Sequence, residues 1–505
     1  MKNIALLLLL LVCAPAIAQN KKTKAVATPD TLQNLDAFVN KMLAEWNVPG
    51  TALCIVKNGK LLYAKGYGVK DLKTKAPVTN QTLFGIASCS KSFTAACLAI
   101  LADEGKLDWN KPVKDYMPDF QLHDEYATRT LTARDLVSHR SGLPRHDYLW
   151  VSAPLNRNEL FDRLKYLPLN KPVYAQYQYN NLMYMAAGVL IERLSGKSWE
   201  AFVREKILDP IGMKTTALTY PEMFKNTDYA LSYDDEKNPE KEAGFDSNVD
   251  AIGPAGAIKA NVSEMANWLM LQLNKGKAGG KVIVSEKNLN ENHTPWAVVQ
   301  PAEAKYPELG FSTYGMGWTL NTYRGHQRRQ HGGSIEGYRS QMTVFPNDNL
   351  AVFITTNTGA VGYNFVSTIT NYIADTYLEK NIIDWNSRFR KDFLEAREKT
   401  AKTKAENENQ RQKDTHPTHA LANYVGVYEH PAYGSLNLML DADALKAEFH
   451  TEKISLRHYH YDIFEGQGDW EGIKFKFLMN AKGDIDRVSL EMPAAAMDIE
   501  MKKKQ

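Results

Sequence analysis

The amino-acid sequence predicts an α+β protein: one antiparallel sheet flanked by helices, followed by a small all-β domain of barrel-like character. Three observations predict this class. Strand-like segments stand near both ends of the stretch 31–378, helices fill its middle, and the residues from about 423 onward alternate between apolar and polar side chains. Strands from both ends of the stretch can therefore pair in one sheet.

The stretch begins with a helix and a hairpin. Apolar residues recur at helical spacing over 35–46. Two strand-like runs follow at 51–56 and 60–65, with Asn58 and Gly59 between them. This dipeptide favours the positive φ angles of a two-residue hairpin turn, so we expect a β-hairpin here.

Helices dominate the middle of the stretch, and a second hairpin stands near its end. Residues 90–102 and 182–194 are two strongly apolar runs of helical length. Strand-like segments at 339–345 and 350–355 flank a turn-forming sequence, and a helical pattern covers 366–378.

The chain changes character after the last of these helices. Residues 384–414 are highly charged, with Trp385, Phe389 and Phe393 on one helical stripe, which predicts a helix that packs at its start and continues as a solvated connector. From Asn423 onward six segments alternate in strand fashion. They are YVGVYEH, GSLNLML, ALKAEFH, ISLRHYHYDIF, IKFKFLM and DRVSLEM.

The first residues are typical of a secretory signal peptide. Lys2 supplies a positive start, residues 4–12 an apolar core and Ala16-Ile17-Ala18 a cleavage site after Ala18. The apolar run is shorter than the roughly 20 residues that span a membrane. Lipidation at Cys13 is the less favoured alternative, because valine precedes it. We therefore expect a periplasmic or secreted protein.

These features predict four parts. They are a signal peptide at 1–18, an α+β domain at 19–380, a charged helical linker at 381–416 and a C-terminal β domain at 417–505.

Composition excludes some classes of partner. The net charge is +3, from 61 basic and 58 acidic residues, so there is no electrostatic reason to expect nucleic acid or an anionic membrane as a partner. No later segment is apolar enough to span a bilayer, and the cysteine spacing predicts neither a disulfide framework nor a zinc site.

A serine and a lysine stand three residues apart at the start of an apolar helix. Ser88 and Lys91 would lie on one helical face, and a serine at a helix start lies where backbone N–H groups favour negative charge. Lys91 can lower the cost of deprotonating the hydroxyl, as a base or as a nearby cation. The alternative is an ordinary helix cap beside a surface lysine.

Two further short motifs add polar groups. Tyr179 and Asn181 precede the helix at 182–194; a tyrosine next to a lysine ammonium should have a lowered pKa and serve as a general base, and an asparagine can bind a substrate amide. His331, Gly333 and Ser334 begin a strand, where glycines permit close approach of the backbone to a ligand. A helix cap and a glycine turn are the simpler interpretations.

Together, S-x-x-K, Y-x-N and H-x-G occur in the order that resembles the serine β-lactamase and penicillin-binding protein superfamily, in its class C β-lactamase-like branch. The resemblance covers residues 31–378. It rests on blocks such as TLFGIASCSKSFTA, LTARDLVSHRSGLPRH, YNNLMYMAAGVLIERLSG and GPAGAIKANVSEMANWL. The C-terminal part is similar to a small β domain that is often appended to such hydrolases.

The resemblance implies an acyl-enzyme mechanism without cofactor or metal. Ser88 would be the nucleophile, Lys91 its activating partner, and Tyr179 a general base and then an acid. Asn181 would position the substrate amide together with His331 and Gly333. The N–H groups of Ser88 and Ser334 would form an oxyanion hole.

The chain departs from many members at one point, where they carry K-T-G and this chain has His331-Gly332-Gly333. A histidine is mostly neutral near pH 7 and suits a substrate carboxylate less well than lysine. Arg339, Arg324, Arg328 or Arg329 could supply the charge, and the alternative is that they are solvated surface residues.

The expected substrates are D-amino-acid-containing peptides or cell-wall fragments. An esterase, a β-lactamase, or a slowly acylating penicillin-binding or peptide-binding module remain alternatives. The oligomeric state stays open.

Overall fold

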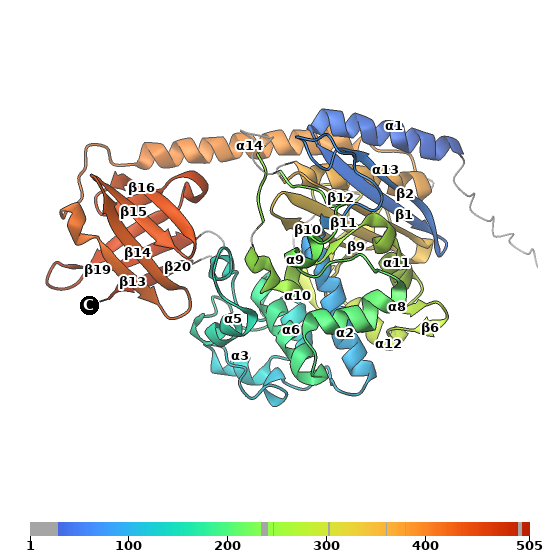
Figure 1. Ribbon diagram of the computed structural model, residues 1–505, viewed down its shortest axis with the longest axis horizontal. Coiled ribbons are helices and arrows are strands. Elements are labelled where there is room, and N and C mark those ends of the chain that lie inside the picture. Colours follow the sequence, from blue (N-terminus) through green and yellow to red (C-terminus); the bar gives the residue numbers. More distant parts are fainter. Residues whose placement is uncertain are drawn as a thin grey trace, which may run out of the picture.

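The computed structural model describes residues 29–233, 241–245, 247–300, 304–359, 361–378, 380–492 and 497–504. It contains a sheet flanked by helices and a separate β-barrel, and a long helix joins the two (Figure 1). The predicted signal peptide lies outside the described residues.

The central sheet has eight strands, and it pairs the beginning of the chain with residues more than 290 positions later, as predicted. Its order is β2 (Lys60–Gly68), β1 (Gly50–Lys57), β12 (Leu350–Thr356), β11 (Tyr338–Phe345), β10 (His326–Ile335), β9 (Thr319–Tyr323), β8 (Ser312–Tyr314) and β7 (Ala297–Gln300). All neighbouring strands are antiparallel.

Both predicted hairpins are present. Between β1 and β2, Asn58 and Gly59 have φ angles of 52° and 73°, the values that a two-residue turn of this kind requires. Between β11 and β12 the chain turns through a short 3₁₀ helix, Pro346–Asp348, which ends at Asn349 with a φ of 47°.

Helices cover both faces of the sheet (Figure 1). On one face α1 (Pro29–Trp46) and α13 (Gly362–Tyr377) share a hydrophobic cluster with β1 and β12. On the other face lie α11 (Val262–Leu273), α2 (Ser90–Asp103) and α6 (Asn181–Ser195), whose apolar side chains form the larger cluster. The strong apolarity of α2 and α6 fits this deep burial.

Shorter elements connect these layers. The helices are α3 (Glu125–Thr130), α4 (Ala133–Val137), α5 (Arg157–Arg163), α7 (Trp199–Val203), α8 (Asp209–Ile211), α9 (Tyr220–Met223), α10 (Gly253–Gly256) and α12 (Glu286–Asn292). Two small ribbons pair β3 (Phe84–Gly85) with β4 (Lys259–Ala260) and β5 (Lys277–Ala278) with β6 (Lys281–Val282).

The charged connector is one long helix, α14 (Trp385–Gln410), as predicted. Trp385 is buried, and Phe389 and Phe393 pack beside it against the cluster under α1 and α13. The rest of the helix is mostly exposed and leads to the barrel (Figure 1).

The C-terminal part is a closed antiparallel barrel of eight strands, where six segments were expected. The strands are β13 (Gly426–His430), β14 (Gly434–Asp441), β15 (Ala444–Phe449), β16 (Glu452–His460), β17 (Ile463–Gly466), β18 (Lys474–Met479), β19 (Ile485–Met492) and β20 (Met497–Lys503). One predicted segment splits at Tyr461, which has a φ of 44°, into β16 and β17. The last strand was not predicted. None of the described helices is long and apolar enough to cross a membrane.

Candidate active site

Ser88 lies on a strained turn at the start of α2. A 3₁₀ helix, Ala87–Cys89, precedes α2 directly, and Ala87 has a φ of 47°, which a residue with a Cβ rarely adopts. Ser90 fixes the turn, because its Oγ accepts the Ile258 N–H over 3.1 Å. Backbone strain of this kind costs about 1–3 kcal/mol and is common at functional sites. Ser88 itself is partly exposed between buried neighbours.

The amine of Lys91 is fully buried and has three oxygen neighbours. It donates to Asn181 Oδ1 over 2.8 Å and to the Ala255 carbonyl over 2.7 Å, and Nζ lies 3.1 Å from Ser88 Oγ. A neutral amine has two N–H donors and one lone pair. The two N–H groups match the two acceptors, so the lone pair is left for the Ser88 hydroxyl.

Burial favours the neutral form of this amine. Desolvation, and next the positive charge of Arg145, hold the pKa of Lys91 well below its ordinary value, whereas Asp147 acts in the opposite direction. A buried lysine without a partner of opposite charge commonly loses its proton. Lys91 is therefore suited to take a proton from Ser88.

Tyr179 also contacts the nucleophile, and its hydroxyl donates to Ser88 Oγ over 2.6 Å. Its pKa was expected to be lowered by Lys91, and this expectation is wrong. Burial raises the pKa of Tyr179 above its ordinary range, and the Ser88 hydrogen bond and the charge of Arg145 offset this only in part. The phenol therefore keeps its proton near neutral pH and can act as a proton donor.

Asn181 holds Lys91 in place. Its Oδ1 accepts from Lys91, and its Nδ2 donates to Asp147 Oδ1 over 3.0 Å. Asn180 caps α6 by accepting the Met183 N–H, which fixes the start of the helix that carries Asn181. In this arrangement the amide oxygen and the amide nitrogen of Asn181 both bond other side chains of the protein. The predicted contact of Asn181 with substrate stays a prediction.

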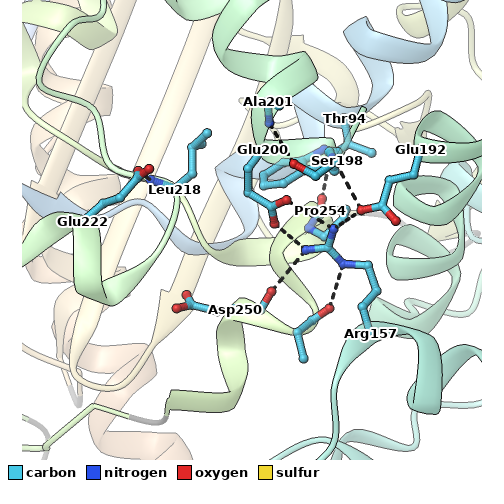
Figure 2. A network of polar contacts seen from close by, with 12 residues as sticks. Thr94, Arg157, Glu192, Ser198, Glu200, Ala201, Leu218, Glu222, Asp250 and Pro254 are labelled. Carbon is cyan, nitrogen blue, oxygen red and sulfur yellow. Dashed lines mark hydrogen bonds and ion pairs between the residues drawn. The ribbon is translucent and has the colours of Figure 1, made fainter. Parts of the chain in front are cut away.

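A partly buried network around Arg157 holds the residues that precede Ala255. The guanidinium bonds two carboxylates and two carbonyls (Figure 2), which are those of Glu192 (2.6 Å), Glu200 (2.5 Å), Ala251 (3.1 Å) and Asp250 (3.2 Å). The Thr94 hydroxyl, on the helix of Lys91, donates to the Pro254 carbonyl over 2.7 Å. These bonds tie the residues before Ala255 to α2 and α6.

Strand β10 brings Gly333 and Ser334 against the turn that carries Ser88. A Cβ on Gly333 would lie 2.2 Å from the Ile86 carbonyl oxygen, so only glycine permits this approach. These residues were expected to begin a strand, but they lie near the end of β10, and Gly333 approaches the protein's own backbone, while its approach to a ligand stays a prediction.

The hairpin of β10 and β11 determines the direction of the Ser334 N–H. Ile335 pairs with Tyr338 across a turn of two residues with positive φ angles of 40° and 78°. Hydrogen-bonded and non-hydrogen-bonded residue pairs alternate along an antiparallel ladder. The backbone N–H of Ser334, next to the pair at the turn, therefore points away from β11. Strand β9 pairs with β10 only as far as Gln330, so the edge at Ser334 has no strand beside it.

The ring of His331 is buried and neutral. Its Nδ1 donates to the Gly332 carbonyl over 2.7 Å, and its Nε2 therefore accepts from the Tyr314 hydroxyl over 2.9 Å. Burial, and next the charge of Lys91, lower the pKa of His331 to about 3. It offers no charge to a substrate carboxylate.

His139 was not predicted to be part of the site, yet it packs directly on Tyr179, with ring centroids 4.4 Å apart. Its Nδ1 accepts the Asn180 N–H over 3.1 Å. The rings of Tyr177, Tyr184 and Tyr314 surround it at 5.4, 5.2 and 4.8 Å. Burial holds the pKa of His139 well below its ordinary value, so this aromatic cluster stays uncharged.

The four arginines that could replace the missing lysine all have partners within the protein, and Arg339 lies opposite Ser334 in the pair of β10 and β11. Arg324 pairs with Asp375 (2.7 Å), Arg328 donates to Asn321 Oδ1 (2.9 Å), Arg329 contacts His293 Nδ1 (2.8 Å) and Arg339 donates to the Tyr338 carbonyl (2.9 Å). Arg328 is buried, not solvated.

Arg145, to which no sequence motif pointed, lies next to the catalytic groups. Its guanidinium lies 5.2 Å from the Tyr179 ring centroid, and its side chain is 45% exposed. It also pairs with Asp147 over 2.5 Å.

Known protein families match both parts of the chain. The family model "Beta-lactamase" matches residues 35–366, and the "Domain of unknown function (DUF3471)" matches residues 410–505. Among curated proteins, the chain is 30% identical to "Unguisins hydrolase ungD'" of Aspergillus campestris over 81% of this chain and 78% of that protein. It is 25% identical to "Protein flp" of Staphylococcus aureus over 65% of this chain and 64% of that protein.

Two solved structures share the fold. A penicillin-binding protein homologue from Pyrococcus abyssi, described as octameric, has a TM-score of 0.62 at 22% identity and covers 94% of this chain and 100% of its own. SurE has a TM-score of 0.55 at 18% identity, with 94% and 99% covered. With a family model that matches most of its length, this chain belongs to the beta-lactamase family of serine hydrolases.

Proposed function

We propose that this protein hydrolyses an amide or ester bond through an acyl-enzyme on Ser88. One observation carries the proposal: the Ser88 hydroxyl lies between a buried amine at 3.1 Å and a partly buried phenol at 2.6 Å. The pKa of the amine is lowered and that of the phenol is raised, so one accepts a proton and the other donates one.

The proposed reaction has two halves. Ser88 Oγ attacks the substrate carbonyl carbon while its proton moves to Lys91 Nζ, and the N–H groups of Ser88 and Ser334 stabilise the oxyanion. The carbon–nitrogen or carbon–oxygen bond then breaks as the Tyr179 hydroxyl protonates the leaving group. Water attacks the acyl-enzyme and returns a proton to Tyr179, and Lys91 returns its proton to Ser88.

For the substrate, we propose a peptide or ester that carries a carboxylate near the scissile bond, such as a D-amino-acid-containing peptide or cell-wall fragment. Arg145 supports this choice, because it is an exposed cation above the ring of Tyr179. A guanidinium can bind a carboxylate through two parallel hydrogen bonds, and the neutral ring of His331 cannot.

We also propose that the protein is exported and that its first 18 residues are removed. Amino-terminal sequencing of the protein recovered from the periplasm or medium tests this. A mature chain that begins at Gln19 is expected, and a chain that retains Lys2 would contradict the proposal.

The function is tested with a substrate panel: a peptide ending in D-Ala-D-Ala, the same peptide as its carboxamide, a p-nitrophenyl ester and a chromogenic cephalosporin. Ser88→Ala should abolish turnover of every substrate that the wild type accepts, and Ser195→Ala, at the far end of α6, should not. Turnover that persists in Ser88→Ala would contradict the proposal. Labelling of Ser88 without product release would instead indicate a slowly acylating binding protein.

A further inference from the structure

The barrel contacts the hydrolase part at a short segment of chain, 145–152, next to the active site. The Tyr433 hydroxyl, in the loop before β14, lies 2.8 Å from Nδ1 of His146, and both side chains are buried. Beside this pair, the rings of Trp470 and Tyr148 lie 5.5 Å apart. In Figure 1 the barrel lies beside α5, which follows this segment.

The turn between β15 and β16 contacts the other end of the segment. The backbone N–H and the hydroxyl of Thr451 both donate to the Ser152 carbonyl, over 3.3 and 2.9 Å, and the Ser152 hydroxyl donates to Glu452 over 2.7 Å. His450 Nε2 donates to the Tyr148 carbonyl over 3.1 Å. The barrel therefore contacts the segment along most of its length.

The opposite side of the same segment faces the catalytic groups. Asp147 accepts hydrogen bonds from Asn181 Nδ2 over 3.0 Å, from Trp150 Nε1 over 2.9 Å and from Arg145 Nε over 2.7 Å. Asn181 in turn accepts from Lys91. His146, which contacts the barrel, is adjacent to Asp147 in the chain.

The segment depends on neighbours for its shape. Its single regular element is the 3₁₀ turn Asp147–Leu149, and Ser152 has a φ of 51°, which is strained for a serine. Trp150 is held from the hydrolase part, where Asn248 donates to its carbonyl over 2.6 Å. A segment with so little regular secondary structure keeps a single conformation only where the residues packed around it fix that conformation.

We infer that the C-terminal barrel is a positioning device for the active site: it fixes the segment 145–152, so that Asp147 orients Asn181 and, through it, Lys91. The inference rests on the proposed function, because it assigns the barrel an effect on the proton transfer from Ser88. Asp147 is a positioning residue in this account, and the barrel supplies no group to the reaction.

The test compares two tyrosines of the barrel in the full-length protein. Tyr433→Phe removes the hydroxyl that contacts His146, and Tyr428→Phe removes one that donates inside the barrel to the Tyr424 carbonyl over 2.9 Å. Each change deletes one buried hydrogen bond. Tyr433→Phe should lower kcat for a p-nitrophenyl ester about fivefold, with little change in KM and a shifted acid limb of the pH profile, whereas Tyr428→Phe should alter none of these.

A second variant avoids the barrel core. Thr451→Val, at an exposed position, should lower kcat in the same direction by a smaller factor, with unchanged thermal unfolding. In combination with Asp147→Asn, the effect of Tyr433→Phe should largely disappear, because both changes act through one carboxylate.

The outcomes separate this inference from the proposed function. If the wild type shows no Ser88-dependent turnover, the proposed function fails. If the wild type turns over and Tyr433→Phe behaves like Tyr428→Phe, or if its effect adds fully to that of Asp147→Asn, the barrel has no positioning role.

Discussion

Two buried charged side chains, one in each part of the molecule, show what determines the state of such a group. In the barrel, Glu465 is 5% exposed and pairs with both Arg457 and Lys474. In the hydrolase part, Lys91 is buried just as deeply, but its partners are an amide oxygen and a backbone carbonyl. Burial with opposite charges gives a structural ion pair, whereas burial with neutral acceptors gives a neutral amine.

The surroundings extend the contrast. The side chains packed on Lys91 are mostly aromatic or neutral polar, with the charges of Arg145 and Asp147 farther out, and burial drives His139 and His331 towards their uncharged forms. The interior of the barrel is filled by rings such as those of Tyr424, Phe464 and Phe477, which pack edge to face. The surroundings of Lys91 shift the pKa values of the groups buried there, whereas the rings inside the barrel pack into a rigid core.

Removing Lys91 and then Lys474, the partner of Glu465 in the barrel, gives the largest expected difference. Lys91→Met should lower kcat/KM by about a thousandfold, the loss typical of a missing general base. Lys474→Met should leave kcat/KM unchanged, because Lys474 pairs only within the barrel. Steady-state kinetics on the p-nitrophenyl ester measures both, and equal effects of the two changes would contradict the comparison.

Removing the Tyr179 hydroxyl should have an effect that depends on the leaving group. Tyr179→Phe should lower kcat/KM about a hundredfold for a peptide, whose amine must be protonated as it leaves. For a p-nitrophenyl ester the loss should be smaller, since p-nitrophenolate leaves without a proton. Equal losses for both substrates would argue against Tyr179 as the acid.

The charges beside Lys91 should shift the pH profile in opposite directions. Lys91 acts as a base when neutral, so activity should rise with pH through its pKa. Arg145 lowers this pKa and Asp147 raises it. Arg145→Gln should therefore move the acid limb of kcat/KM to higher pH, and Asp147→Asn to lower pH. Shifts in the same direction would refute this electrostatic account.

The smallest expected effect is on stability. Burial lowers the pKa of His146 to about 4 and that of His139 well below its usual range, so the unfolded chain binds protons that the folded chain does not. Below about pH 6.5 each of these histidines should lower the free energy of unfolding by about 1.4 kcal/mol per pH unit, as the pH falls towards the pKa of that histidine in the folded protein. Urea unfolding at pH 7.5 and 5.5 measures this. His139→Gln should weaken the dependence, and the exposed His416→Gln should not.

Local patterns predicted the elements whose cause is local. The turn at Asn58 and Gly59, the apolar helices α2 and α6 and the sheet that joins both ends followed from spacing and turn chemistry. The strand β20 did not, because MDIEMKK has few β-branched residues and pairs only through the closure of the barrel. Nor did β17, which is set apart by the left-handed Tyr461.

In the site, the motifs predicted Ser88, Lys91 and Tyr179 as neighbours but not their environment. The raised pKa of Tyr179 depends on burial, which adjacent residues in the chain do not reveal. Asp147 was not selected because its contact with Asn181 joins a 3₁₀ turn to the start of α6, and only the fold brings these together.

The most direct test of the central claim, that a neutral Lys91 activates Ser88, is the rate at which a fluorophosphonate labels the protein as a function of pH, followed by intact mass and peptide mapping. We predict one adduct, on Ser88, whose rate of formation rises through an apparent pKa far below that of an ordinary lysine and loses this dependence in Lys91→Met. An adduct on another residue, or the same pH dependence in Lys91→Met, would contradict the claim.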